Sequence, residues 1–380
     1  MSQSAVAEPG YTAARERPPS NVAGPWAWAR ANLFGSWWST ALTLVLGYVV
    51  VRVAFGFIAW AVLNAVWSVP YNAQGMPDTS ACLKMQGVGA CWAVIADKYR
   101  LILFGRYPYA EQWRPALCVA LFIGLYVVSG MRRFWRKELA LIWLATLAVI
   151  GILMWGGIFG LRLVPEDEWG GLPITLILAT LGLAFAFPLA ILVALGRRST
   201  TLPAVHLLCV LYVELIRGVP LVALLFMASV MFPLFLPEGV NFNNLLRVQI
   251  AIILFVAAYV AEVIRAGLQA LPKGQAEAAD ALGLSYWKKT GFIVLPQALR
   301  LVIPPLVNTC IGFFKDTSLV LIVGMFDLLM MGKVALSDPP WQSFFNEVYI
   351  FLALIYIAFC YAMSRYSRGL ERDLGRAHRR

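Results

Sequence analysis

The chain contains, along most of its length, stretches of about 18 or more apolar residues, each able to cross the roughly 30 Å hydrocarbon core of a bilayer as a helix. Backbone N–H and C=O groups inside lipid must be paired within their own segment, so these stretches should be helical. The alternation of apolar and polar residues typical of a membrane β-barrel is absent. The sequence therefore predicts an all-α, polytopic membrane protein.

Eight membrane-spanning helices are predicted from the limits of the apolar stretches. The fifth stretch is too long for a simple crossing, and Gly218 and Pro220 should break it. A short apolar piece at residues 319–331 has no partner span and is interpreted as a half-helix or re-entrant segment. The predicted spans cover residues 41–67, 116–130, 139–163, 174–195, 206–236, 249–268, 300–318 and 345–364.

Composition supports this interpretation, because 61% of the residues are hydrophobic and only 13% are charged, against about 25% charged in soluble chains. The net charge of +11 could suggest a nucleic-acid partner. The basic residues instead form short clusters between apolar stretches, mostly on one side of the predicted layout, as the positive-inside rule expects. We therefore expect membrane lipid and no nucleic acid as a partner, with both termini in the cytoplasm.

The sequence gives little support for a metal site or a catalytic site. His206 and His378 lie far apart and have no Cys or carboxylate at metal-ligand spacing, so no metal site and no catalytic residue is predicted. Four of the six cysteines fall in apolar stretches and are interpreted as small hydrophobic residues. Cys82 and Cys91 share a polar loop assigned to the outside of the cell, where a disulfide can persist; whether they are bridged stays open.

Four regions follow from the layout. Residues 1–36 are polar and proline-bearing and are expected to form a disordered cytoplasmic tail. Residues 37–170 should hold three N-terminal accessory helices with a periplasmic loop at about 68–114. Residues 171–372 should hold five further helices, and residues 373–380 form a basic tail. Arg52, near the middle of the first span, costs about 2.5–3.5 kcal/mol to insert, so it should snorkel or face protein.

A cytoplasmic loop, residues 272–297, carries the most specific motif. Residues 274–283 read GQAEAADALG and precede Ile293, Leu295 and Pro296. The pattern resembles the EAA loop of permeases of ATP-binding-cassette (ABC) importers: E-A-A, three residues, G, nine residues, I, one residue, L-P. The good helix formers before Gly283 favour a short helix whose small side chains can seat closely in a partner's groove. An ordinary alanine-rich connector would predict neither Ile-x-Leu-Pro nor its distance.

Further segments resemble the permeases of polar amino-acid importers. They are YVELIRGVPL at residues 212–221, YVAEVIRAG at 259–267 and KDTSL at 315–319. Together with the loop they cover about half of the chain, and the N-terminal part is similar to the larger membrane subunits of general L-amino-acid importers of proteobacteria. The resemblance implies a five-helix type I ABC importer core that moves L-amino acids from periplasm to cytoplasm across the bacterial inner membrane. The ATPase-coupling residues that it implies are Glu277, Ala278, Ala279, Gly283, Leu295 and Pro296.

The same resemblance implies partners. They are a cytoplasmic ABC ATPase dimer, a second homologous permease subunit and a periplasmic amino-acid-binding protein. ATP and Mg would be bound by the ATPases, and this chain would bind no cofactor. In agreement, a phosphate-cradling Gly-x-x-x-x-Gly-Lys-Ser/Thr motif occurs nowhere in the sequence, so this chain is not expected to be an enzyme.

Charged residues of the apolar stretches are candidates for the substrate path or gate. Glu214 and Arg217 stand three residues apart, as do Glu262 and Arg265, so each pair can neutralise itself on one helix face. Either a structural ion pair or a role in gating or substrate contact fits these pairs.

Lys315 precedes Asp316, Thr317 and Ser318, which are helix-capping residue types. A half-helix N-terminus beside a cation is a favourable place for a carboxylate. We hypothesise that Lys315 and the amides after it hold the α-carboxylate of the substrate. The alternative is that Lys315 pairs with Asp316 at the outer interface.

Two other function classes remain as alternatives. An ion-coupled secondary transporter could use Glu214, Glu262 and Asp316 as proton or sodium sites. That hypothesis leaves the loop at 272–297 unexplained. A structural membrane scaffold leaves both this loop and the half-helix unexplained.

Overall fold

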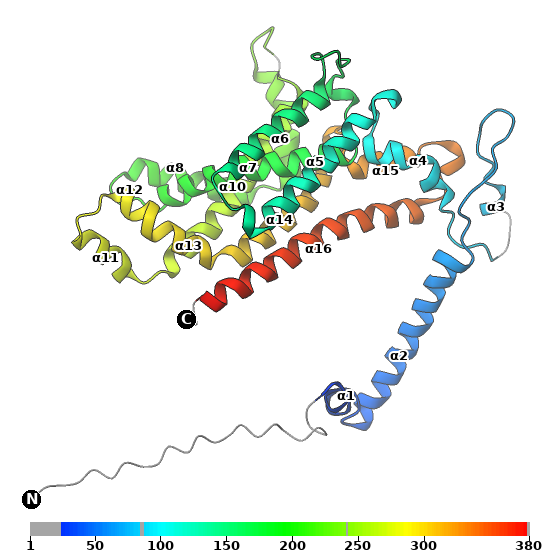
Figure 1. Cartoon of the computed structure of the whole chain (residues 1–380), viewed down its shortest axis with the longest axis horizontal. Helices are drawn as coiled ribbons and strands as arrows, with labels where there is room; N and C mark the ends of the chain where they lie inside the picture. Colours follow the sequence, from blue (N-terminus) through cyan, green and yellow to red (C-terminus); the bar gives the residue numbers. More distant parts are fainter. Residues whose placement is uncertain (1–23, 84–86, 241, 378–380) are drawn as a thin grey trace, which may run out of the picture. The chain divides into compact units, whose positions relative to one another are not determined.

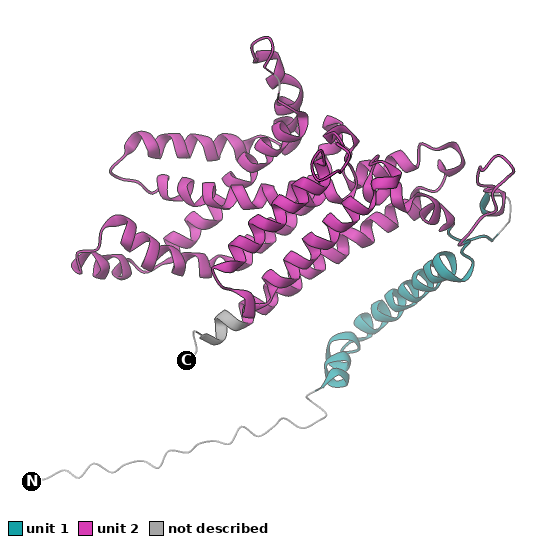
Figure 2. Cartoon of the chain, turned by 45° about the horizontal axis from the view of Figure 1, so that its top comes forward, with its two compact units in different colours: residues 1–66, 82–90 teal, residues 67–81, 91–380 magenta. Residues whose placement is uncertain are grey.

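The computed structural model describes residues 24–83, 87–240 and 242–377, which form α-helices joined by short 3₁₀ and π segments (Figure 1). Among these residues β-structure is limited to isolated bridges, such as those of Tyr71 with Pro77 and of Gly171 with Asp327. Contacts divide the chain into two units, residues 1–66 with 82–90 and residues 67–81 with 91–380 (Figure 2). The prediction of an all-α protein is confirmed.

The first unit contains α1 (Pro25–Leu33) and α2 (Trp37–Ile58), and α2 continues as a π-helix, Ala59–Leu63. The α1 helix corrects the prediction that residues 1–36 are wholly disordered. Its Pro25 stands at the start of the helix, where the fixed φ of proline favours helical geometry and its missing N–H costs nothing. Residues 1–23 of the predicted tail, like residues 378–380 at the other end, lie outside the described residues.

The remaining helices follow in chain order. Their bounds are α3 (Ser80–Leu83), α4 (Ala93–Phe104), α5 (Trp113–Gly130), α6 (Glu138–Trp155), α7 (Leu172–Gly196), α8 (Pro203–Gly218), α9 (Leu221–Phe226), α10 (Asn244–Ala270), α11 (Lys273–Ala281), α12 (Tyr286–Lys289), α13 (Leu295–Leu301), α14 (Ile303–Asp316), α15 (Leu328–Ala335) and α16 (Phe345–Ala377).

Seven of the described helical segments are long and apolar enough to cross a membrane, and the bent pair of α8 and the segment Leu221–Phe235 raises the number to eight. The two halves of this pair meet at 104°. Val219, before Pro220, is extended at φ −102° and ψ 133°, because the proline ring disfavours helical geometry in the preceding residue. Both the predicted number of spans and the predicted break at Gly218 and Pro220 are confirmed.

The end of the third span and the content of the polar loop differ from the predictions. The α6 helix ends at Trp155 and not near residue 163, because Gly156 and Gly157 adopt φ of 70° and 79°, which L side chains rarely adopt. The polar loop at 68–114 contains α4, whose Val94 and Ile102 are fully buried. At 12 residues α4 is too short to cross a bilayer, so the search for long apolar stretches missed it.

The centre of the second unit is the close pair of α7 and α10. A Cβ atom built on Gly182 of α7 would lie 2.8 Å from Ile252 Cγ2 of α10, so only glycine permits this approach. Half of the most apolar window of each helix is buried within the chain. Of the charged residues of the candidate site, Glu262 and Arg265 lie near the end of α10, and Arg197 directly follows α7.

Candidate functional site

The predicted coupling loop folds into α11, α12 and a π-helix, Thr290–Val294, which leads into α13 (Figure 1). The expected short helix is present as α11. Leu295 begins α13 and Pro296 is its second residue, directly after the π-helix. The Leu-Pro end of the motif therefore starts the helix that continues the chain toward α14.

Gly283 ends α11 in the manner that its predicted role as a stop requires. Its φ is +70°, its N–H donates to Asp280 O at 2.9 Å, and the Leu284 N–H donates to Ala279 O at 3.2 Å. These two bonds are those of a Schellman cap, in which a left-handed residue satisfies the last carbonyl groups of a helix. The glycine of the motif thus sets the direction in which the chain leaves α11.

Two contacts attach α11 to the segment that follows it. Lys289 Nζ lies 2.6 Å from Asp280 Oδ1 and 2.8 Å from Oδ2. Gln297 Nε2 donates to Gln275 Oε1 at 3.4 Å. Ala279 is 1% exposed and faces inward. A displacement of α11 is therefore passed to the start of α13 through ionic, polar and packing contacts.

The outer side of the loop is open. Glu277 and Ala278 are exposed, in contrast to the buried Ala279. The large apolar side chains of Leu282, Trp287 and Phe292 are 79%, 69% and 81% exposed. Large exposed apolar side chains on a loop of this kind are candidates for contact with a partner protein. Of the two predicted coupling alanines, Ala278 is available to a partner and Ala279 supports the loop from within.

The candidate charged residues of α8 and α10 meet around one arginine. Arg197, the C-cap residue directly after α7, donates from Nη1 to Glu262 Oε2 and from Nη2 to Glu214 Oε1, both at 2.8 Å. Arg265 Nε also donates to Glu262 Oε2, at 3.0 Å. Arg197 is 10% exposed, so its charge is held largely away from water. The cluster joins the ends of three helices.

One of the two predicted ion pairs is confirmed and the other is wrong. Glu262 and Arg265 pair within α10, as their spacing predicts. Glu214 bonds instead to Arg197, and Arg217 lies 3.8 Å from Glu262 and faces the ring of Tyr259. Sequence reasoning missed Arg197 because its partners are 17 and 65 residues away. The only signal was its place in a basic pair at the end of a span.

The segment after Lys315 differs from its prediction. The α14 helix continues directly into a 3₁₀ helix, Thr317–Val323, so no free helix N-terminus stands beside Lys315. The reason is that the Thr317 and Ser318 hydroxyls donate to the carbonyls of Phe314 and Lys315, each at 2.8 Å, and cap no N–H group. Lys315 is exposed and forms no ion pair with Asp316 or any other described residue.

The cap of the short helix after this segment comes from Asp327. Its carboxylate accepts from the Leu329 and Met330 N–H groups, at 3.1 and 2.9 Å, and begins α15. The side chain is fully buried, and burial raises its pKa from an ordinary 3.8 to about 6. The predicted half-helix at 319–331 is therefore a 3₁₀ turn, then Gly324 at φ +76°, then a capped helix that starts later.

This raised pKa predicts a pH dependence of stability. The folded chain binds the Asp327 proton more tightly than the unfolded chain, so its contribution to stability is greatest below about pH 4 and is lost as pH rises through about 6. Asp327→Asn keeps an acceptor for the cap but cannot titrate. Between pH 4.5 and 7.5 the melting temperature of the native chain in detergent should fall relative to that of the variant. A constant difference between the two curves would contradict the assignment.

The cysteines and a metal site are the last features considered in the sequence. Cys82 and Cys91 are both disulfide-bonded, whereas Cys118, Cys209, Cys310 and Cys360 are free thiols. Among the described residues no group of three or more His, Cys, Asp or Glu side chains is placed to hold a metal ion. Of the two histidines, His206 forms a hydrogen bond between its Nδ1 and the Arg197 carbonyl oxygen at 2.9 Å. His378 lies outside the described residues.

Comparison with known proteins gives matches over both halves of the chain. The family model described as "Binding-protein-dependent transport system inner membrane component" matches residues 186–376. The inner membrane amino-acid ABC transporter permease protein YhdY of Escherichia coli (strain K12) is 46% identical over 94% of this chain and 95% of its own length.

Two further relatives differ in length. The glutamate/glutamine/aspartate/asparagine transport system permease protein BztC of Rhodobacter capsulatus is 37% identical, with both chains fully covered. The probable glutamine ABC transporter permease protein GlnP of Bacillus subtilis (strain 168) is 35% identical over 53% of this chain and 91% of its own length. The chain belongs to the family of binding-protein-dependent transport system inner membrane components, the permease subunits of ABC transporters.

Proposed function

We propose that this chain is the permease subunit of an importer that moves L-amino acids from periplasm to cytoplasm, driven by ATP hydrolysis in partner subunits. The observation that carries the proposal is α11, a capped helix with Glu277 and Ala278 exposed, in a chain whose full-length relatives are named as amino-acid permeases. The chain itself is a transport component and not an enzyme.

The mechanism follows from how α11 is held. When an ATPase moves against the exposed side of α11, the Asp280–Lys289 pair and the buried Ala279 carry the displacement to α13. The α10 helix ends directly before α11, so the same displacement acts on the helix that carries Glu262. The cluster around Arg197 links that end to α7 and α8. Closure of the ATPases would thus move several membrane helices together.

The partners proposed are an ATPase dimer that binds ATP and Mg, a second homologous permease subunit and a periplasmic amino-acid-binding protein. Family membership supports the ATPase and the binding protein. We also propose that residues 37–170 are accessory helices and residues 171–372 the permease domain, since the family model begins only at residue 186. We also propose that both termini lie on the cytoplasmic side with α11. The even numbers of candidate spans, six before α11 and two after it, support this orientation.

Reconstitution tests the function. The chain, its ATPase, membrane partner and binding protein are placed in liposomes without an ion gradient, and uptake is measured for a panel of amino acids that includes glutamate, glutamine, aspartate and asparagine. ATP added on the ATPase side should drive uptake of at least one of them. Uptake that needs a proton or sodium gradient and ignores ATP would instead support the ion-coupled alternative, which family membership does not favour.

Lys315 remains our candidate for binding the α-carboxylate of the substrate. The backbone amides after it are no longer part of the hypothesis, because α14 runs directly into the 3₁₀ helix. Lys315 lies within the candidate span Ile303–Val323, is exposed and has no ion-pair partner among the described residues. A cation that meets a carboxylate away from bulk water contributes about 1.5–3 kcal/mol, so Lys315→Met should lower uptake about tenfold or more without loss of assembly. Uptake is measured in the reconstituted system.

The matched control for this substitution is Lys333→Met. Lys333 is also an exposed lysine without an ion pair among the described residues, but it lies on α15, outside the candidate spans. It should leave uptake close to that of the native chain. Unchanged uptake with unchanged substrate affinity in Lys315→Met would remove the hypothesis.

A further inference from the structure

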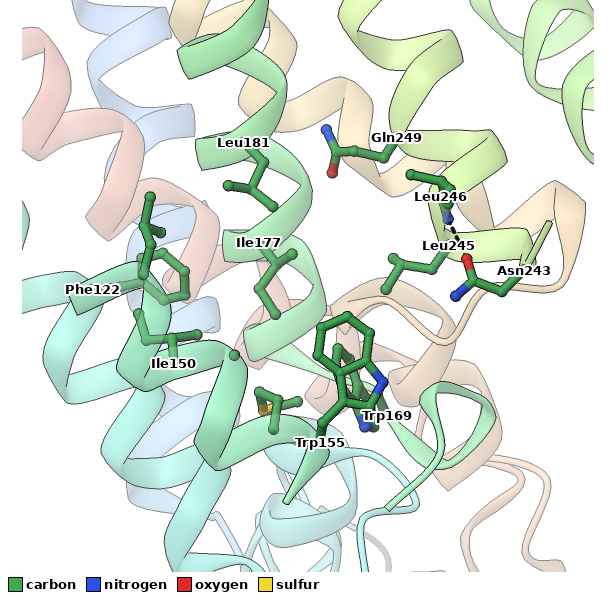
Figure 3. A pocket seen from close by; sticks show the side chains of 13 residues that line it. Phe122, Ile150, Trp155, Trp169, Ile177, Leu181, Asn243, Leu245, Leu246 and Gln249 are labelled. Atoms are coloured by element: carbon green, nitrogen blue, oxygen red, sulfur yellow. Dashed lines mark hydrogen bonds between the residues drawn. The ribbon is translucent and has the colours of Figure 1, made fainter. Parts of the chain in front are cut away.

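A cavity of about 320 Å³ lies between α5, α6, α7 and α10 (Figure 3). Apart from the amide side chains of Asn243 and Gln249, its lining is apolar or aromatic and selects no single occupant. A surface that selects by charge as well as by apolarity lies instead on α16.

The exposed face of α16 changes from apolar to cationic along the helix. Residues spaced three or four apart share one face of a helix. One such row, which we call the α16 stripe, consists of exposed residues only: Leu354, Ile357, Tyr361, Arg365, Arg368 and Arg372. Ser367 lies on the other side of the helix and is 7% exposed. The stripe is therefore a face of α16 that the described part of the chain leaves uncovered.

Contacts between α5 and α16 place Arg365 at the level of the lipid headgroups. Trp135 is an exposed tryptophan, a residue type that gathers at membrane interfaces, and its Nε1 donates at 2.8 Å to a carbonyl in the last turn of α5. A Cβ atom on Gly130, which ends α5, would lie 3.9 Å from the ring of Tyr366, the residue after Arg365. Residues 348–364 of α16 carry no charge. The apolar half of the stripe thus lies in hydrocarbon, and its cations begin at the headgroups.

This end of the helices lies on the side of α11. The helices α5, α10 and α16 belong to the second, sixth and eighth candidate spans, so all three cross the membrane in the same direction. Because α11 follows the end of α10, the cationic half of the stripe faces the same leaflet as α11. In the orientation proposed above this is the cytoplasmic leaflet, whose anionic lipids attract basic residues next to a span.

The cations of the stripe are not neutralised within the described part of the chain. None of Arg365, Arg368 and Arg372 forms an ion pair with a described residue. Glu371 is outside the stripe, and its carboxylate accepts from Ser367 Oγ at 2.9 Å. Arg372 Nε donates to Arg368 O at 3.0 Å, so its guanidinium turns back toward the membrane. A partner of the stripe must therefore bring negative charge to the headgroup level.

We propose that the α16 stripe binds an anionic phospholipid, with its phosphate between Arg365 and Arg368 and one acyl chain along the apolar half. The rise from Leu354 to Arg365 is about 16 Å, close to the roughly 15 Å of hydrocarbon in one leaflet. A free phosphate would leave the apolar half uncovered. An apolar helix of another subunit would leave the arginines without a counter-charge. An anionic lipid matches both halves in polarity and in length.

The first experiment tests whether charge selects the lipid. The full chain is extracted from nanodiscs of equal phosphatidylglycerol and phosphatidylcholine with the same acyl chains, and the retained lipids are counted by native mass spectrometry. The native chain should retain phosphatidylglycerol in excess. In the double variant Arg365→Gln/Arg368→Gln this excess should fall about tenfold or more, since each cation near an anionic surface contributes about fivefold. Equal retention of both lipids by the native chain would overturn the proposal.

The matched control is the double variant Lys273→Gln/Lys288→Gln. It also removes two exposed cations that have no ion pair among the described residues, but these lie on α11 and α12 and not on the stripe. It should retain phosphatidylglycerol as the native chain does. Equal loss in both double variants would mean that net charge alone attracts the lipid, and the stripe would not be a site.

The second experiment tests the apolar half of the stripe. Free glycerol phosphate in excess carries the same phosphate without acyl chains, so it should leave the retained phosphatidylglycerol in place. Its displacement of the lipid would show that the arginines bind phosphate alone. Unchanged lipid but loss of a membrane partner in Arg365→Gln/Arg368→Gln would assign the stripe to a protein interface and equally overturn the proposal. Failed amino-acid uptake would leave it standing, because lipid binding requires only the chain in a bilayer.

Discussion

Gly283→Val should lower ATP-driven amino-acid uptake about tenfold while the chain still assembles in the membrane. Gly283 holds φ +70°, where an L residue costs about 1–2 kcal/mol and a β-branched one more. That energy corresponds to a factor of about 5 to 30 in the fraction of α11 that keeps its cap. The ATPases would then hydrolyse ATP without moving the membrane helices. Uptake and ATP hydrolysis are measured together in the reconstituted complex.

Gly274→Ala is the matched control on the same helix. Gly274 lies in the first turn of α11 without positive φ, and a Cβ atom there meets nothing within 4 Å. Alanine favours a helix over glycine by about 1 kcal/mol, so uptake should be kept or slightly raised. Equal uptake by both variants and the native chain would mean that the shape of α11 does not matter for coupling.

Arg197→Met should destabilise the chain by about 2–4 kcal/mol. The substitution removes a hydrogen bond between charged groups at Glu262, which contributes about 1.5–3 kcal/mol, and a more exposed one at Glu214, which contributes up to about 1 kcal/mol. Glu262 keeps Arg265, which limits the loss. The melting temperature in detergent should fall by about 3–5 °C, and uptake should fall with it.

Substitution of the neighbouring Arg198 is the control for the general effect of removing a positive charge. Its Nη1 donates to a single backbone acceptor, Leu268 O, at 3.0 Å, so Arg198→Met should cost less than half as much. A normal melting temperature with strongly reduced uptake in Arg197→Met would contradict a structural role for the cluster. It would assign these charges to the gate or the substrate path instead.

Local features of the sequence predicted the local structure of the loop at 272–297 well. The helix, its glycine stop and the Leu-Pro start of α13 all depend on residues close together in the chain, so propensity and spacing determine them. The same holds for the break before Pro220 and for the long apolar spans. What spacing could not show was that Ala279 faces inward whereas Ala278 is exposed.

Features that depend on distant contacts were missed or wrong. Glu214 has Arg217 three residues away but bonds to Arg197, because the fold brings the end of α7 against α8. Thr317 and Ser318 have capping side chains, yet a hydroxyl can donate to a carbonyl as well as accept from an N–H, and here both donate. The role of Asp327 as the cap was invisible because its burial comes from the packed helices around it.

Cross-linking of α11 to the ATPase tests the central claim most directly. In the assembled complex, Ala278→Cys should form a cross-link to the ATPase with a short bifunctional maleimide, because Ala278 is exposed. Ala279→Cys should not, because that position is 1% exposed and supports the loop from within. If the cysteine at 278 stays open to water-soluble reagents in the complete complex and never links to an ATPase, α11 is not the coupling helix.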